Sequence, residues 1–478
     1  MRRIAILVGC LAALLSLIVS GVFHASERSR RRTTAQAALA ADQGLLVVYA
    51  RPLPAEASRL SFRFAAIEAV REDGGPVPLA VAFPDASVKS LTRERRLASA
   101  ALPAGRYSGL ALRFSDVTLA GEQGRAPLQA SEEPVVVAAP FTLEKRKAIV
   151  LLLGLEYRDA VATGFRFTPS FTAAPPPKPA VGLLGAASAR GADSVVLFDK
   201  SAGNVAAVVP TGRGPSGLAI DSERRRLYVA EPPEDAVETI GLLEQSVLSR
   251  IPLRGGDEPV ELALLPDGRT LLSANGGSST VSVLDAVSAV ETARIGVGEQ
   301  PRSITVDRSG RRAYVFNEGS STVSVLDVAA RAVVATIPTE AGPFRGQLDR
   351  SGQRLFVAHR SSPSLTLIDT GTLTVTSRLY VGNGATTLKV DTASDRLYVA
   401  RHGARDVQVF DPSSLLPVDA VPVDGDVSYM AIDGEGNNLT LALPGLAAID
   451  VVRIVGKAAT ARVEVGGDPY AVALLGER

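Results

Sequence analysis

A unit of about 42 residues repeats through the last two-thirds of this 478-residue chain. Each unit starts near a proline, runs through an apolar stretch that ends in Asp, and continues through two further runs such as RLYVA and VSVLD. Four short strands per unit at a fixed period of this size predict a β-propeller. Successive starts are separated by 44 residues once and then by 42 residues five times. The starts are Pro215, Pro259, Pro301, Pro343, Ala385, Val427 and Pro469.

The two ends of the repeat region predict how many blades the ring has. Six units are complete, and the tail PYAVALLGER (469–478) resembles only the first strand of a unit. Residues 181–212 resemble the other three strands. Joining these pieces gives a seventh blade built from both ends, which leaves no open sheet edge. We therefore predict an all-β fold with a seven-bladed β-propeller over residues 181–478.

The chain before the repeats is predicted to hold a second β-domain. Alternating apolar runs between Gly and Pro turns fill residues 44–172 and favour a β-sandwich of about seven or more strands. The run AAPPPKPA (173–180) cannot continue a strand ladder and predicts an extended, semi-rigid linker. Residues 27–43 are polar and are expected to form a spacer.

Residues 1–26 are expected to act as a signal or membrane-anchor segment. The uncharged apolar run at 4–23 is long enough to cross a membrane once. We expect an uncleaved anchor helix, with a cleaved secretory signal and a lipoprotein leader that uses Cys10 as the alternatives. The arginines after the run outnumber those before it, which argues against export. The domain content nevertheless favours an extracytoplasmic place in the cell envelope, either periplasmic or at the cell surface.

The composition excludes several functions. A net charge of +1 gives no general attraction to nucleic acid. The single cysteine, Cys10, lies in the leader, so the folded region has no disulfide, thiolate nucleophile or CxxCH haem attachment. The sequence also contains no GxSxG elbow, phosphate-binding loop or HExxH zinc motif. We therefore predict no catalytic residue, no cofactor and no metal.

Short runs within the repeats resemble a known family. The run YVFN at 314–317 differs at one position from the tetrad YVTN, and YVA at 228–230 and 398–400 are close variants. The repeat region thus resembles the YVTN family of seven-bladed propellers, known from prokaryotic surface-layer and other envelope proteins. The N-terminal domain resembles an immunoglobulin-like or transthyretin-like domain of unknown function found in bacterial lipoproteins. The runs that carry this second resemblance are 44–56, 102–114 and 140–153. Neither resemblance implies a defined catalytic activity.

Aspartates recur at the ends of the first and third strands of the units. A short carboxylate at a strand end can accept hydrogen bonds from the backbone N–H groups of the following turn. We therefore expect these residues to serve the scaffold. They include Asp221, Asp307, Asp349, Asp391 and Asp433 after first strands, and Asp199, Asp285, Asp327, Asp369 and Asp411 after third strands.

Candidate functional residues lie where the repeat is broken. The residue after the second strand, which is Asn in the family tetrad, should approach one face of the ring. In chain order this residue, which we call the tetrad slot, is Ala189, Glu231, Asn275, Asn317, His359, Arg401 and Leu443.

His359 and Arg401 depart from Asn on neighbouring blades, with Arg360, His402 and Arg405 close by in sequence. Three hypotheses remain open for this corner. The residues could be solvated loop residues, a site for a carboxylate, phosphate or acidic glycan, or a histidine-based metal site.

Taken together, these patterns favour a non-catalytic cell-envelope protein that presents a rigid propeller face, held at the membrane by its N-terminal segment. The expected partner is an unknown envelope protein, or else an anionic small molecule or glycan. The alternative is a hydrolase or isomerase that resembles the lactonase-type propellers. Such an enzyme would need clustered carboxylates, a metal or a catalytic histidine in the central channel.

Overall fold

The computed structural model describes residues 39–122, 124–158, 160–162 and 165–477. These residues belong to one compact unit and form β-strands joined by turns and five short 3-10 turns. No helix in this described part is long and apolar enough to cross a membrane. The predicted anchor segment at 4–23 lies outside the described residues.

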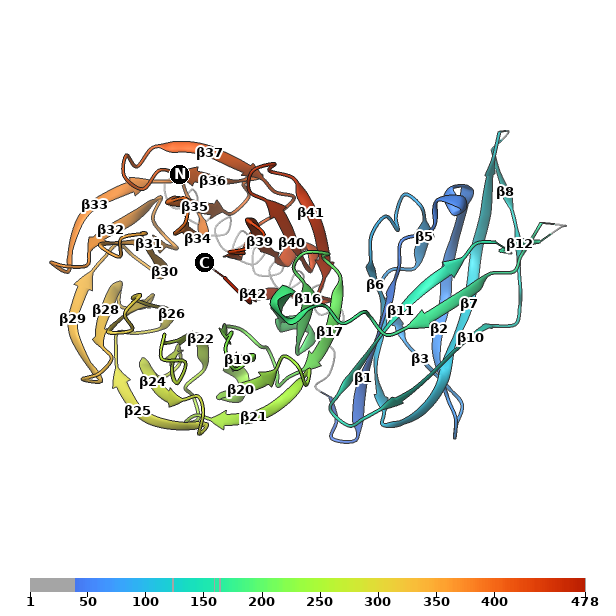
Figure 1. Cartoon of the computed structure of the whole chain (residues 1–478), viewed down its shortest axis with the longest axis horizontal. Coiled ribbons are helices and arrows are strands. Elements are labelled where there is room, and N and C mark those ends of the chain that lie inside the picture. Colours follow the sequence, from blue (N-terminus) through green and yellow to red (C-terminus); the bar gives the residue numbers. More distant parts are fainter. Residues whose placement is uncertain (1–38, 123, 159, 163–164, 478) are drawn as a thin grey trace, which may run out of the picture. The chain divides into compact units, whose positions relative to one another are not determined.

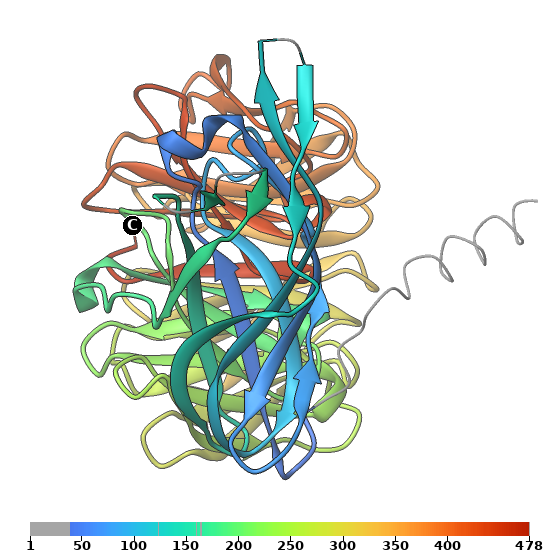
Figure 2. The ribbon, with the colours of Figure 1, turned by 90° about the vertical axis from the view of Figure 1, so that its right-hand side faces the viewer.

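The N-terminal domain, whose strands face the viewer in Figure 2, contains two main sheets. Their strand orders are β14-β11-β1-β6-β4 and β10-β7-β2-β3, and a small sheet is formed by β12, β13 and β9. In β2, buried and exposed residues alternate, so one face packs into an aromatic core that includes Phe62, Phe64 and Phe114. The last strand runs to Ala174, two residues beyond the predicted end of the domain. The elements are β1 (Gln43–Ala50), η1 (Ala55–Arg59), β2 (Leu60–Arg71), β3 (Pro76–Pro78), β4 (Ala80–Val81), β5 (Asp85–Ser87), β6 (Arg95–Pro103), β7 (Gly105–Gly121), β8 (Gly124–Pro127), β9 (Gln129–Ala130), β10 (Val135–Leu143), β11 (Ala148–Glu156), β12 (Val161–Ala162), β13 (Arg166–Phe167) and β14 (Ser170–Ala174).

The rest of the chain forms seven four-stranded antiparallel sheets arranged as a ring, as expected of a seven-bladed propeller (Figure 1). Blade 1 combines β42 (Pro469–Leu474) with β15 (Leu184–Ala189), β16 (Ser194–Asp199) and β17 (Val205–Pro210). Blades 2 to 7 follow the chain, each from its innermost to its outermost strand.

Blade 2 consists of β18 (Leu218–Asp221), β19 (Arg226–Glu231), β20 (Ala236–Gly241) and β21 (Ser246–Pro252), and blade 3 of β22 (Pro259–Leu264), β23 (Thr270–Asn275), β24 (Thr280–Asp285) and β25 (Val290–Gly296). Blade 4 consists of β26 (Pro301–Val306), β27 (Arg312–Asn317), β28 (Thr322–Asp327) and β29 (Ala332–Pro338), and blade 5 of β30 (Pro343–Leu348), β31 (Arg354–His359), β32 (Ser364–Asp369) and β33 (Thr374–Tyr380). Blade 6 consists of β34 (Ala385–Asp391), β35 (Arg396–Arg401), β36 (Asp406–Phe410) and β37 (Pro417–Pro422), and blade 7 of β38 (Tyr429–Ile432), β39 (Asn438–Leu443), β40 (Ala448–Arg453) and β41 (Ala459–Glu464). Four further 3-10 turns are η2 (Val181–Leu183), η3 (Arg190–Ala192), η4 (Pro232–Glu234) and η5 (Pro444–Leu446).

The tail strand closes the ring as the repeat pattern predicts. Strand β42 pairs antiparallel with β15, and Ala473 lies opposite Ala186. The buried ammonium of Lys200 donates to Asp433 Oδ1 and to the Leu475 carbonyl, both at 2.6 Å. This contact ties the tail to blades 1 and 7, so the seam is held by a charged pair as well as by the strand ladder.

The recurring aspartates cap turns, as expected. Asp285 Oδ1, for example, accepts the backbone N–H groups of Val287 and Ser288, each at 2.9 Å. These hydrogen bonds, with help from Arg269, hold the pKa of Asp285 at about 2. The aspartates are therefore part of the scaffold in each blade and do not form a shared acidic site.

The sandwich contacts the propeller close to the seam. The Tyr49 hydroxyl donates to the Glu464 carbonyl at 2.7 Å, and Arg96 Nη1 donates to the Val465 carbonyl at 2.9 Å. Leu45, Val47 and Tyr49 also share one apolar cluster with side chains of blades 1 and 7. The sandwich thus contacts the chain at Glu464 and Val465, a few residues before the closing strand β42.

Candidate functional site

The innermost strands bring three large polar side chains together at the axis of the ring. Glu261 lies on blade 3, Arg345 on blade 5 and Tyr429 on blade 7, each at the third position of its repeat unit. Arg345 Nη2 lies 3.1 Å from Glu261 Oε2, and its guanidinium lies 4.3 Å from the centre of the Tyr429 ring. Small residues occupy the same repeat position in the other four blades and leave room for this group. They are Gly217, Ser303, Thr387 and Ala471.

This axial group is buried, with side-chain exposures of 11% for Arg345 and 5% for Glu261. Burial raises the pKa of Glu261 to about 7, although the nearby Arg345 opposes the rise. Burial also raises the pKa of Tyr429. Among the described residues, Arg345 Nε has no hydrogen-bond partner. The guanidinium therefore keeps one buried, unsatisfied N–H donor while it is paired with Glu261.

A cavity of about 440 Å³ adjoins the axial group at Arg345, and arginines line it. Arg345 forms part of its floor, and the other lining residues come from blades 1, 3, 4, 5, 6 and 7. We call this cavity the arginine funnel. Its charged and aromatic lining residues are Arg190, Arg302, Arg345, Arg360, Glu318, Asp426, Phe344 and Tyr470.

Stacking and ion pairing hold the arginines of the funnel in place. Arg190 lies over the Tyr470 ring at 4.1 Å, and Arg360 lies over the Phe344 ring at 4.5 Å. Glu318 pairs with both Arg302 and Arg360, at 2.5 and 3.4 Å. One glutamate cannot occupy all the N–H donors of two exposed guanidinium groups that line the cavity. The funnel can therefore accept oxygen atoms of an anion.

The structure separates the five residues that the sequence groups at one corner. Arg360 lines the arginine funnel. Arg401, His402 and Arg405 surround a different hollow of about 430 Å³ on the loop of blade 6. Their partners there are Asp406 for Arg401 at 3.3 Å, Asp426 for His402 at 2.7 Å and the Asp424 carbonyl for Arg405 at 3.4 Å.

His359 is fully buried, so its place differs from the expected face of the ring. Its Nδ1 lies 3.3 Å from the Ser364 carbonyl and its Nε2 lies 3.5 Å from Thr366 Oγ1. Asn317, in the same tetrad slot of blade 4, makes equivalent bonds to Thr322 and Ser324. Burial lowers the pKa of His359, which favours the neutral ring. His359 thus joins two strands of its blade, and the predicted pairing with Arg401 around a ligand is not formed.

The hypothesis of a metal site at this corner also lacks a ligand set. Within the part of the chain that the structure describes, no group of three or more His, Cys, Asp or Glu side chains is arranged to hold a metal ion.

We expect His359→Asn to leave the free energy of unfolding within about 0.5 kcal/mol of wild type, because Asn fills this slot on blades 3 and 4. His359→Ala should cost about 1–3 kcal/mol, because it leaves buried polar groups without a partner. Urea unfolding of both variants measures the difference. Equal destabilisation by Asn and by Ala would contradict the strand-joining role.

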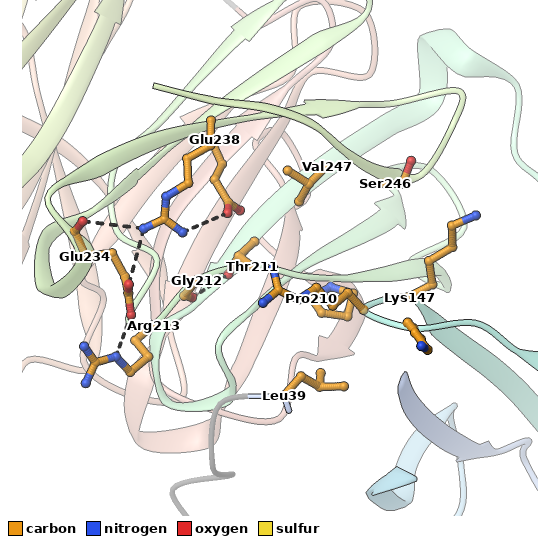
Figure 3. A pocket seen from close by; sticks show the side chains of 13 residues that line it. Leu39, Lys147, Pro210, Thr211, Gly212, Arg213, Glu234, Glu238, Ser246 and Val247 are labelled. Atoms are coloured by element: carbon orange, nitrogen blue, oxygen red, sulfur yellow. Dashed lines mark hydrogen bonds and ion pairs between the residues drawn. The ribbon is translucent and has the colours of Figure 1, made fainter. Parts of the chain in front are cut away.

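Sequence reasoning missed an acidic pair in the tetrad slot of blade 2. Glu231 is fully buried, and Glu238 occupies the place that Ser282 and Ser324 take in blades 3 and 4. Arg250 Nη1 lies 3.6 Å from Glu231 Oε2 and 3.5 Å from Glu238 Oε1. Glu238 also lines a pocket of about 460 Å³ (Figure 3).

Burial and the neighbouring carboxylate raise the pKa of Glu231 well above its ordinary value, and burial raises that of Glu238. The Oε2 atoms of Glu231 and Glu238 have no hydrogen-bond partner among the described residues. Two ionised carboxylates cannot bond to each other, whereas a single shared proton supplies the missing donor. The acidic loop at 231–238 was visible in the sequence, and alignment of the repeats places Glu238 against Glu231.

Comparisons with known proteins support the fold of the repeat region. Residues 184–394 match the family described as YNCE-like beta-propeller, and this match does not include the sandwich. No curated protein matches the chain significantly. The resemblance of the sandwich to a lipoprotein domain stays a prediction.

Several solved structures are similar to this one. A functionally unknown protein from Desulfotomaculum acetoxidans is 15% identical with a TM-score of 0.53, over 61% of this chain and 98% of that chain. The dihydro-heme d1 dehydrogenase NirN, in complex with DHE, is 15% identical with a TM-score of 0.50, over 63% and 78% of the two chains. Hydrazine synthase from Kuenenia stuttgartiensis is 20% identical with a TM-score of 0.49, over 54% and 88%. At these identities the likeness concerns the fold alone.

Proposed function

We propose that this chain is a non-catalytic binding protein of the cell envelope and that the arginine funnel takes up an anionic small molecule. The observation that carries the proposal is the convergence of four arginines from three blades on one cavity. Arg345 is paired with Glu261 and Arg190 lies 4.0 Å from Asp468, whereas Arg302 and Arg360 share the single carboxylate of Glu318. Arginine suits this task because its planar fork of donors matches a carboxylate or phosphate.

The rigidity of the ring supports the same function. The axial group lies on innermost strands, where each blade is paired on one side and packed against its neighbours. Donors held in this way lose little freedom when a ligand binds, so more of the interaction energy appears as affinity.

The proposed location rests on the apolar run at 4–23 and on the resemblance to envelope proteins. The N-terminal mass of the mature protein, together with protease accessibility in intact cells, tests it. A full-length chain that is protected from external protease both in intact cells and after the outer barrier is opened would oppose it.

The alternative is a hydrolase or isomerase of the lactonase-like type. Glu261 favours this alternative, because a buried carboxyl with a pKa of about 7 can act as a general base. Turnover of a panel of lactones by the wild type, lost in Glu261→Gln, would replace the binding function with an enzymatic one.

The binding function is tested by calorimetric titration with citrate, glucuronate and phosphate. We expect the double variant Arg302→Ala/Arg360→Ala to lose at least about 100-fold in affinity for whichever of these binds, because each charge-assisted bond contributes about 1.5–3 kcal/mol. The matched control is Arg401→Ala/Arg405→Ala, which removes two arginines from the hollow on blade 6 and should leave affinity unchanged. Equal loss in both double variants, or no binding of any anion to the wild type, would contradict the proposed site.

A further inference from the structure

Arg345, which lines the arginine funnel, already binds a carboxylate, and that carboxylate belongs to the buried Glu261. Glu261 reaches Arg345 from blade 3 to blade 5, past the small Ser303 of blade 4. The pair thus spans the channel instead of joining adjacent strands. It uses a single contact, at 3.1 Å, and leaves Arg345 Nε without a partner among the described residues.

The surroundings are shaped for this arrangement. A Cβ atom at Gly217 would lie 2.6 Å from the Cα atom and 2.9 Å from Oε1 of Glu261, so only glycine leaves space for the glutamate there. The Tyr429 ring covers one face of the Arg345 guanidinium. The contacts with Glu261 and Tyr429 therefore fix the orientation of the guanidinium.

Resting on the proposed function, we propose that the ligand of the funnel is a small carboxylate, which replaces the Glu261 carboxylate on Arg345 while Glu261 takes up one proton. The Glu261–Arg345 ion pair is exchanged for a ligand–Arg345 ion pair, and the proton comes from solvent to an Oε atom of Glu261. The net charge of the buried groups is zero before binding, when Glu261 and Arg345 are paired. It is also zero afterwards, when the ligand carboxylate pairs with Arg345 beside a neutral Glu261, so no buried charge is left without a partner.

The groups that face Glu261 favour this exchange. They are Arg345 on β30, Tyr429 on β38, Tyr470 on β42 and Glu477 in the turn after β42. Arg345 is the cation of this set, and Glu477 is itself paired with Lys389 at 2.7 Å. A ligand that neutralises Arg345 removes the charge that opposes protonation, so the pKa of Glu261 should rise above its value of about 7.

The charge balance favours a monocarboxylate over a phosphate dianion at the floor. Once Glu261 is neutral, Arg345 offers one positive charge in a buried place. A carboxylate can take the place of Glu261 at Nη2 and satisfy that charge. A dianion would bring a second negative charge into the same buried space, which costs several kcal/mol unless it too is paired.

The test measures proton uptake during binding. Wild-type protein is titrated with glucuronate and, separately, with inorganic phosphate at pH 8, in buffers that differ in ionisation enthalpy. We expect glucuronate to bind with uptake of 0.5–1 proton, an estimate of roughly one proton from the single exchanged carboxylate. Its affinity should fall about tenfold per pH unit above the pKa of Glu261.

The variant Glu261→Gln should bind glucuronate about tenfold more tightly at pH 8, with no proton uptake and a flat pH profile, because the competing charge is absent. Glu261→Met is a second variant in case the glutamine disturbs folding, and circular dichroism checks both. The control Glu318→Gln alters the funnel wall without touching Arg345 and should keep the proton uptake of the wild type.

Each outcome decides one point. Glucuronate binding without proton uptake would overturn the exchange and leave the binding function intact. Tighter binding of phosphate than of glucuronate would overturn the carboxylate assignment. Loss of anion binding altogether would instead contradict the proposed function, which the Arg302/Arg360 experiment measures separately.

Discussion

A chain that stops at Asp468 is expected to lose the folded propeller. The missing residues include β42 (Pro469–Leu474), in which Ala471, Val472 and Leu474 are buried. Exposing a Val or a Leu side chain costs about 1.5–3 kcal/mol each, and the ladder to β15 is lost as well. The sum is comparable to the whole stability of a typical domain, about 5–15 kcal/mol.

The truncated chain also leaves Lys200 with one of its two partners, because the Leu475 carbonyl is removed. Thermal unfolding followed by circular dichroism measures the loss, and we expect the cooperative transition of the propeller to disappear. Adding a peptide of residues 469–478 should restore part of the transition, whereas a scrambled peptide of the same composition should not. A truncated chain that unfolds cooperatively at the wild-type temperature would show that the ring does not depend on its seam.

The second large effect concerns the acidic pair of blade 2. Replacing Glu231 by Gln should make the protein more stable at alkaline pH, because the amide supplies a donor to Glu238 without carrying a charge. The wild-type pair has a raised pKa for Glu231, so the folded state keeps a proton that the unfolded chain releases. The contribution of this proton to the free energy of unfolding is fully present below about pH 4. It is lost as pH rises toward the raised pKa of Glu231 in the folded protein.

The gain from Glu231→Gln should therefore be near zero at pH 4 and on the order of 3 kcal/mol by pH 9. Urea unfolding at several pH values measures it. The control is Glu244→Gln, an exposed glutamate on the same blade, which should reproduce the pH dependence of the wild type. A gain that is the same at pH 4 and pH 9 would mean that the shared proton contributes nothing.

The repeat made the architecture predictable because its signals are local. Strand patterns, turn residues and the spacing of prolines lie within each unit of about 42 residues, so the blades and even the composite blade could be placed in advance. The Lys200–Asp433 ion pair and the hydrogen bond from Arg96 to the Val465 carbonyl join residues that are far apart in the sequence. No local pattern indicates them.

The candidate site was harder to predict for two physical reasons. The side-chain chemistry of His359 predicts a ligand-binding role, whereas its burial in the tetrad slot makes it a link between strands, as it does for Asn317. The funnel depends on which side chains meet across the ring, and Glu261 and Arg345 are separated by 84 residues and a whole intervening blade. Comparing the second and third positions of every unit would have singled out Arg302, Arg345 and Glu261 as the charged departures.

The composite blade has a consequence for how the protein is made. The edge of β15 that pairs with β42 has no partner strand until Ala473, opposite Ala186, has been synthesised about 290 residues later. At typical synthesis rates of 5–20 residues per second this interval is roughly 15–60 s. Throughout it, β15 offers an unsatisfied edge to any other nascent chain nearby. The organism must therefore shield this edge, by a chaperone or by the early-finished sandwich, or else keep the chain unfolded until translation is complete.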